Sequence, residues 1–390
     1  PPDGFTTENY VSPRGGLPTF RMMRRISDMA AMTEDWLEPA RPVDAAVALL
    51  LSEASDLWEI RGKSQNAVRP GSEETNVFQE ERKAVYYALR HAGYRVDLIT
   101  EADVREGWLE RYRALYVIGE NMERATVQPI AEWVKKGGLL YLSAGAARKN
   151  EYDEPFDGLD AVLGRGPVQE WRRYRGALRA KLELPFLEPL AHVQPADGEG
   201  HAYPALAVLE RFAVGTQTVV LDRFDDGSPA AIRTRYGQGA AYTLGVLPGL
   251  AWLHKALPRM PCGKGGPETT ADGHPRYPSF EPVDFDETAG RAILRPLIEH
   301  GVQPDLRTQP RGIVANRLVG PKGTVLTVVH LAMQQRGAAE PAVFEVAGVE
   351  RVGRVWSYEF PTGLPFETRD GRLRITVPRL EWADLIVIEK

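Results

Sequence analysis

The stretch that constrains the fold most is residues 111–150, because it places a helix between two short apolar runs. Residues 114–119 form a continuous apolar run, as in the buried strands of parallel sheets. Apolar residues then recur with helical spacing across 127–134, and Gly137-Gly138 can end this helix because glycine readily adopts left-handed conformations. Residues 139–142 predict the next strand. This order indicates an α/β fold, in which ligands bind at the carboxyl ends of the strands.

The preceding residues repeat this pattern and extend the predicted sheet. Residues 45–51 predict the first strand, 76–92 a helix, and 93–99 a turn and a strand. Short crossovers of this kind produce a parallel sheet with right-handed connections. We therefore predict a mostly parallel α/β domain over residues 41–303. Its further predicted elements are strands at 160–163, 207–214, 218–221, 230–234 and 240–244, and a helix capped by Asp286.

From residue 312 the apolar period changes to two, which is typical of half-buried strands. The short strands and their turns, Asp370-Gly371 among them, predict a small all-β sandwich over residues 304–390. Structural support or an interface is its expected role. The predicted strands are 312–319, 324–331, 342–346, 352–358, 373–377 and 385–388.

Residues 1–40 predict a loop followed by a helix with one apolar face. Such a face has to be buried, and the sequence leaves two expectations open for what covers it: the domain that follows, or a domain that this chain lacks. The apolar face consists of Met22, Ile26, Met29, Thr33 and Trp36.

Composition narrows the classes of partner. The net charge of −5 gives no general attraction to phosphate backbones, so nucleic acid is not an expected partner. The longest apolar run is too short to cross a bilayer, which argues against a membrane partner. The single cysteine, Cys262, excludes an internal disulfide and leaves the cellular compartment open.

Several runs resemble a known family. They are VALLLSEASDLWE at 47–59, AVYYALRHAGYRVDLIT at 84–100, the strand-helix-strand stretch from ALYVIGENM at 114 onward, and DGSPAAIRTRYGQGAAYTLGVLPGLAWL at 226–253. Together they resemble the glutamine-amidotransferase-like trimerisation domain of bacterial family 42 β-galactosidases. The final β domain resembles the small C-terminal sandwich of the same enzymes. The resemblance covers roughly residues 19–390 and depends on pattern and order rather than on a diagnostic motif.

The resemblance implies a class I amidotransferase-like (flavodoxin-like) fold and a homotrimer. In this family a catalytic (β/α)8 barrel with two glutamates comes first, and residues 1–40 resemble the tail of that barrel and the linker after it. The barrel itself is not in this sequence. The sequence is therefore expected to be a fragment, or the protein to act beside a separate catalytic partner.

The amidotransferase resemblance also implies a cysteine nucleophile on the turn after the strand at 139–142. Here that turn begins with Ser143, and Cys262 lies far away in the sequence. Without a thiolate, glutaminase chemistry cannot proceed. Ser143 lacks the context G-x-S-x-G of an activated serine, so a strand-end serine bonded to the backbone is the favoured interpretation, with a nucleophile as the alternative.

Polar residues at the other strand ends are expected to face the same crevice. As acid and base, the carboxylates could act on a sugar or a small polar ligand. They could equally cap helices or pair with Arg148 or Lys149, and this structural interpretation is favoured. The candidate ligand-binding residues are Glu53, Glu120, Asn121, Ser143 and Arg148.

Two further motifs are weaker. His254, Cys262 and His274 lie close in sequence, but their spacing fits no tight pair of metal ligands, so no metal and no cofactor are predicted. Trp171 begins a run of aromatic and basic residues at 171–175, for which a solvated turn is favoured over a loop that stacks on sugars or contacts another subunit.

We therefore predict a non-catalytic, oligomer-forming region of a glycoside-hydrolase-like protein that supports a barrel in cis or in trans. A carbohydrate-binding protein and a hydrolase that uses the strand-end crevice are the two alternatives.

Overall fold

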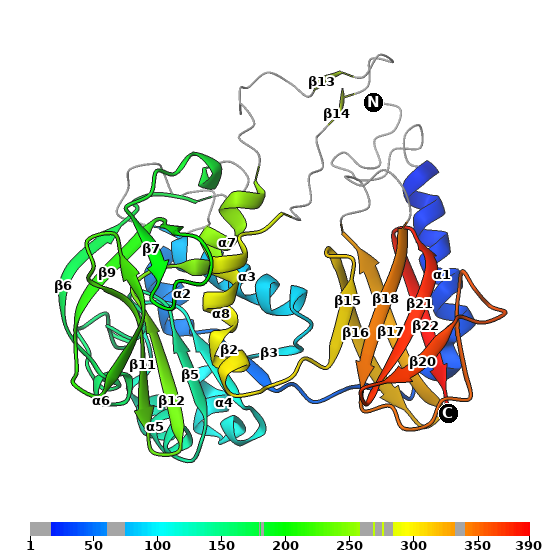
Figure 1. Cartoon of the computed structure of the whole chain (residues 1–390), viewed down its shortest axis with the longest axis horizontal. Helices are drawn as coiled ribbons and strands as arrows, with labels where there is room; N and C mark the ends of the chain where they lie inside the picture. Colours follow the sequence, from blue (N-terminus) through cyan, green and yellow to red (C-terminus); the bar gives the residue numbers. More distant parts are fainter. Residues whose placement is uncertain are drawn as a thin grey trace. The chain divides into compact units, whose positions relative to one another are not determined.

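The computed structural model consists of two compact units, shown in Figure 1. We call Ala45–Pro304 the α/β unit, and the combination of Pro1–Asp44 with Asp305–Lys390 the sandwich unit. The structure describes residues 17–60, 75–178, 180, 183–257, 268–269, 275–276, 284–331 and 340–390.

The α/β unit is built on a sheet of nine strands in the order β3-β2-β4-β5-β12-β11-β10-β7-β8. The first five strands are parallel, and the last four continue the sheet in antiparallel pairs. The sheet is thus mixed rather than mostly parallel. Its strands are β2 (Val47–Leu50), β3 (Val96–Ile99), β4 (Ala114–Val117), β5 (Leu139–Leu142), β7 (Ala191–Pro195), β8 (Tyr203–Ala205), β10 (Thr218–Phe224), β11 (Pro229–Tyr236) and β12 (Gly239–Leu244).

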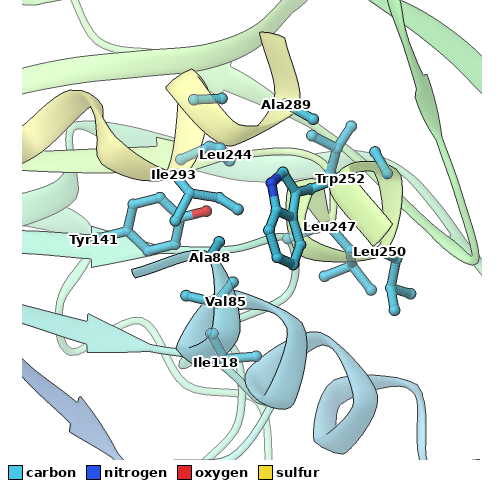
Figure 2. Packing of buried hydrophobic residues seen from close by; sticks show 14 of the residues in the cluster. Val85, Ala88, Ile118, Tyr141, Leu244, Leu247, Leu250, Trp252, Ala289 and Ile293 are labelled. Carbon is cyan, nitrogen blue, oxygen red and sulfur yellow. The ribbon is translucent and has the colours of Figure 1, made fainter. Parts of the chain in front are cut away.

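Helices cover both faces of this sheet. Neighbouring residues of β4 point to opposite faces, so that Tyr116 joins the core under α3, α7 and α8, while Leu115 joins the core under α4, α5 and α6. Figure 2 shows Val85 of α3 and Ile293 of α8 packed close to Tyr141 of β5. The helices are α2 (Glu53–Ile60), α3 (Val77–His91), α4 (Glu101–Arg105), α5 (Val127–Lys135), α6 (Asp160–Leu163), α7 (Pro248–Ala256) and α8 (Glu287–Glu299).

A separate two-stranded ribbon lies beside the sheet. It pairs β6 (Arg165–Arg173) with β9 (Val208–Val214) in antiparallel orientation. The predicted turn at Trp171 is therefore wrong, because this residue lies within β6 opposite Glu210. The smaller elements of the α/β unit are β13 (Glu268–Thr269), β14 (Pro275–Arg276) and the 3-10 turns η2 (Trp108–Arg111), η3 (Arg124–Thr126) and η4 (Leu184–Phe186).

Local predictions in this unit have mixed outcomes. The Asp286 cap is confirmed, since its carboxylate accepts N–H bonds from Thr288 and Ala289 at the start of α8. The predicted strand at 160–163 is wrong: these residues form the short helix α6, which ends at Gly164 in the left-handed conformation. Three apolar residues in a row, Ala161–Leu163, do not distinguish a strand from a buried helical turn.

The sandwich unit has two sheets that enclose one core. The five-stranded sheet has the order β1-β16-β17-β22-β19, and the four-stranded sheet has the order β15-β18-β21-β20. All six predicted strands are present. The strands are β1 (Arg41–Pro42), β15 (Leu306–Gln309), β16 (Ile313–Gly320), β17 (Gly323–His330), β18 (Glu340–Ala347), β19 (Arg354–Ser357), β20 (Phe366–Arg369), β21 (Arg372–Leu380) and β22 (Ala383–Glu389).

The first helix, α1 (Leu17–Leu37), belongs to the sandwich unit. Met29 and Thr33 are buried, and the Trp36 ring meets the Trp356 ring of β19 edge to face, with their centroids 5.3 Å apart. Ile26, which was predicted to face inward, is 52% exposed. Within the described residues, no helix is both long and apolar enough to cross a bilayer.

Candidate functional site

The predicted site begins at the loop that follows β5, at the carboxyl edge of the parallel strands. Ser143 is fully buried, and its Oγ has no hydrogen-bond partner within the described residues. Gly145 and Ala147 have positive φ values of 75° and 54°, so the chain reverses sharply here. The Gly145 N–H donates to Glu210 Oε2 of β9 over 2.5 Å. The serine is thus at the predicted strand end and has no access to solvent, but the favoured interpretation of a hydroxyl bonded to the backbone is wrong within the described residues.

Trp171 of β6 covers this loop. A Cβ on Gly145 would lie 2.5 Å from the Trp171 ring and 3.4 Å from Phe78, so the indole packs directly against the glycine backbone. Only a residue without Cβ permits this approach, and the positive φ favours glycine as well. Because the Trp171 side chain occupies the space in front of the loop, a substrate would have to displace it.

A buried ionic cluster fixes the same loop from beneath. Arg148 Nε donates to Glu210 Oε1 over 2.6 Å, and its Nη1 donates to Asp160 Oδ2 over 3.2 Å. Arg165 Nε also donates to Asp160, over 2.8 Å, and its Nη2 donates to the Ala147 carbonyl. The side chains of Glu210 and Arg165 are fully buried, and burial lowers the pKa of Arg165. Two positive and two negative groups balance each other here.

Arg148 is thus a structural residue of this cluster, because its donors are used within the protein. Glu120 is similarly occupied: it follows β4 and accepts from Arg173 Nη1 of β6 over 2.7 Å. The favoured interpretation gave the strand-end carboxylates a structural role, as helix caps or as partners of Arg148 or Lys149. Glu120 does have a structural role, but its partner is Arg173. Glu120 and Arg173 join the strand end to the ribbon that carries Trp171.

Asn121 closes the crevice between β2 and β4, where the strand order reverses. Its backbone carbonyl accepts from Ser52 Oγ and Ser55 Oγ, over 3.0 and 3.1 Å. Its Nδ2 donates to the Asn150 carbonyl and to Asp153. Ligands of open α/β folds bind at this reversal point. In this chain, buried and mutually bonded side chains fill it.

Glu53 does not join the other candidates. Its side chain is exposed, while its backbone N–H donates to Glu101 Oε2 over 3.1 Å. Glu101 is buried, and this burial raises its pKa. The structure thus brings Ser143 and Arg148 to one loop, places Glu120 and Asn121 at the end of the neighbouring strand, and leaves Glu53 in solvent.

Sequence reasoning missed Glu210, Asp160, Arg165 and Arg173, which hold the loop and the ribbon in place. One signal was present for Glu210, since a glutamate within the apolar run 207–214 is unexpected in a buried strand unless it is paired. A second buried acid, Glu81 of α3, accepts N–H bonds from Gly249 and Leu250 at the start of α7, and burial raises its pKa to about 8.

Two of the three residues considered and rejected as metal ligands lie outside the described part of the chain. Cys262 and His274 are not within the described residues, whereas His254 lies in α7. Among the residues that the structure does describe, no group of three His, Cys, Asp or Glu side chains is placed to hold a metal ion.

Comparison with known proteins finds similarity to solved structures alone. No family model matches the sequence, and no curated protein matches it. The β-galactosidase from Rahnella sp. R3 superposes with a TM-score of 0.60 and 16% identity over 95% of this chain and 45% of its own. The β-galactosidase from Bacillus circulans sp. alkalophilus gives a TM-score of 0.56 and 17% identity over 90% of this chain and 42% of its own.

A third enzyme extends the likeness beyond β-galactosidases. The α-L-fucosidase isoenzyme 2 from Paenibacillus thiaminolyticus has a TM-score of 0.60 and 15% identity over 98% of this chain and 54% of its own. At such identities the likeness concerns the fold. The chain spans about half the length of these relatives, and its fold is shared with that part of several glycoside hydrolases, family 42 β-galactosidases among them.

Proposed function

We propose that this chain is a non-catalytic accessory region of a β-galactosidase-like glycoside hydrolase, supporting carbohydrate hydrolysis by a catalytic barrel. The observation that carries the proposal is the closed strand-end corner. Ser143 is buried, Trp171 covers the loop, and Glu120 is paired with Arg173. A catalytic group must reach its substrate within hydrogen-bond distance, and none of these groups is free to do so.

The finer fold assignment is part of this proposal. We infer that the α/β unit descends from a glutamine-amidotransferase-like domain and forms trimers. Its strand order β3-β2-β4-β5-β12 is that of a flavodoxin-like sheet, and a sharp loop follows β5, where an amidotransferase would carry its nucleophile. The loop geometry supports this origin, while the side chains around it support the loss of the reaction.

The proposal is tested by activity and assembly measurements on the purified chain. Alone, it should hydrolyse neither p-nitrophenyl β-D-galactoside nor glutamine, and light scattering after size exclusion should show a trimer. Addition of the barrel portion of a family 42 enzyme should leave the trimer intact. Hydrolysis by the chain alone that disappears in Ser143→Ala would overturn the non-catalytic assignment, and a monomer at all concentrations would overturn the assembly role.

A further inference from the structure

A hollow of about 490 Å³ lies at the amino edge of the parallel strands, the edge opposite to the closed corner. Its walls come from the segments that lead into β4, β5 and β12, together with the residue that ends α8. It lies wholly within the α/β unit. The side chains that line it include Glu110, Arg113, Trp133, Lys136, Gln238 and His300.

The polar lining offers donors and acceptors in similar measure. Arg113 and Gln238 are exposed, and neither side chain makes a hydrogen bond or an ion pair with any other described residue. Lys136 Nζ lies 3.5 Å from Glu110 Oε1, so these two charges largely cancel. Partial burial lowers the pKa of His300, which favours the neutral imidazole, with one nitrogen donating and the other accepting.

The backbone adds negative potential to this lining. The helices α5 and α8 both end at the hollow, with Lys136 and His300 as their C-terminal caps. The carboxyl end of a helix carries partial negative charge on its free carbonyls, which favours cations and disfavours anions. Because Glu110 largely cancels the charge of Lys136, Arg113 is left to compensate the helix ends, and no surplus of positive charge remains for an anionic ligand.

Trp133 provides an apolar, fixed part of the floor. The residue is 7% exposed, and a Cβ on Gly138 would lie within 2.4–2.5 Å of three atoms of its ring. The glycine backbone therefore packs against the indole and holds it in one orientation. A rigid aromatic group beside planar polar side chains can receive a ligand that has both apolar C–H faces and hydroxyl groups.

We propose that this hollow is a binding site for a neutral saccharide. Each hydroxyl group of a sugar both donates and accepts, which matches the free Arg113 and Gln238 and the neutral His300, and the volume lies within the range of about 300–1,000 Å³ typical of small-molecule sites. The site does not depend on the proposed accessory role, because it uses neither the closed corner nor an oligomer interface.

The test is saturation-transfer NMR on the full chain, with lactose and cellobiose as neutral probes and galacturonic acid as the anionic probe, each at about 10 mM to detect millimolar affinity. Variant Arg113→Ala/Gln238→Ala removes two exposed, unpaired side chains of the hollow. The control is Gln194→Ala/Arg223→Ala, which removes the same two residue types from exposed positions that face each other across β7 and β10, where Arg223 Nη1 donates to the exposed Gly227 carbonyl over 2.8 Å.

At least one neutral sugar should give transfer signals, and the Arg113→Ala/Gln238→Ala variant should weaken its binding by about tenfold or more through the loss of hydrogen bonds. The control variant should bind as the unmodified chain does, and both variants should keep the thermal midpoint. Three results would overturn the site: no transfer to either neutral sugar, transfer that the Arg113→Ala/Gln238→Ala variant leaves unchanged, or binding of galacturonic acid in preference to the neutral sugars.

Discussion

Replacing Glu210 by alanine is the most direct test of the buried cluster beneath the strand-end loop. The Glu210 carboxylate is fully buried and accepts from the Gly145 N–H and from Arg148. Its removal leaves Asp160 as the only acid of the cluster beside two arginines, Arg148 and the fully buried Arg165. Breaking a buried ion pair from one side costs about 3–5 kcal/mol, because the remaining charge stays desolvated.

Glu170→Ala is the matched control for this change. Glu170 lies on the same ribbon, is 42% exposed, and pairs with Arg211 over 2.7 Å. An exposed ion pair contributes less than about 1 kcal/mol, so the control should alter stability little. The two variants thus remove the same residue type from neighbouring positions of one ribbon and differ mainly in burial.

Denaturant unfolding combined with hydrogen exchange gives the readout. Because the chain has two compact units, two unfolding transitions can occur, and the relevant one is that of the α/β unit. Hydrogen exchange measured on peptides of the α/β unit identifies this transition. Glu210→Ala should lower the unfolding free energy of this unit by about 3–5 kcal/mol and speed exchange across 143–147. A loss no larger than that of Glu170→Ala, with unchanged exchange in the loop, would refute the cluster's role.

Three further outcomes follow from packing and burial. Gly249→Ala should destabilise the α/β unit by about 1–3 kcal/mol in thermal melts, because the new Cβ would lie 2.8 Å from Glu81 Oε2. This clash should outweigh the better helix propensity of alanine, and a stabilised variant would contradict the prediction. The raised pKa of Glu81, about 8 against 4.5 when unfolded, contributes stability that is complete below pH 4.5 and is lost as pH rises through 8. Glu81→Gln should therefore flatten the decline in unfolding free energy between these pH values, by up to about 5 kcal/mol, and an unchanged pH profile would exclude the effect. Trp36→Ala should lower the stability of the sandwich unit by about 1–3 kcal/mol in denaturant melts, because the partly buried indole loses its contact with Trp356. An effect confined to the α/β unit would contradict the packing of α1 on the sandwich unit.

Four of the five parallel strands were predictable because each is a short apolar run buried on both faces; the edge strand β3, in which Leu98 is 51% exposed, is the exception. The run at 139–142 coincides with β5, and the loop after it lies where the α/β pattern placed it. The helix at 160–163 was not predictable, because so short an apolar run has no period. The partner of α1 was not predictable either, since an apolar helix face indicates that burial is needed but not which distant strand provides it.

The candidate site shows where residue identity stops being informative. Glu120 and Arg148 have the right chemistry and lie near the right strand ends, yet their roles depend on partners that are distant in the sequence, Arg173 and Glu210. The ribbon of β6 and β9 supplies both partners and also carries Trp171. A position-by-position reading assigns a glutamate and an arginine to a crevice; only the three-dimensional pairing shows that the crevice is filled.

The two edges of the same sheet therefore have opposite character. At the carboxyl edge, buried groups satisfy one another, and a ligand would have to compete with bonds of 2.5–2.7 Å around Glu210 and Glu120. At the amino edge, Arg113 and Gln238 face solvent and make no such bonds within the described residues. Binding at the amino edge sacrifices no internal pair, whereas binding at the carboxyl edge would leave a buried charge unpaired at a cost of several kcal/mol. If this unit binds a ligand, the energetic difference between the edges favours the amino edge, the reverse of the usual arrangement in open α/β folds.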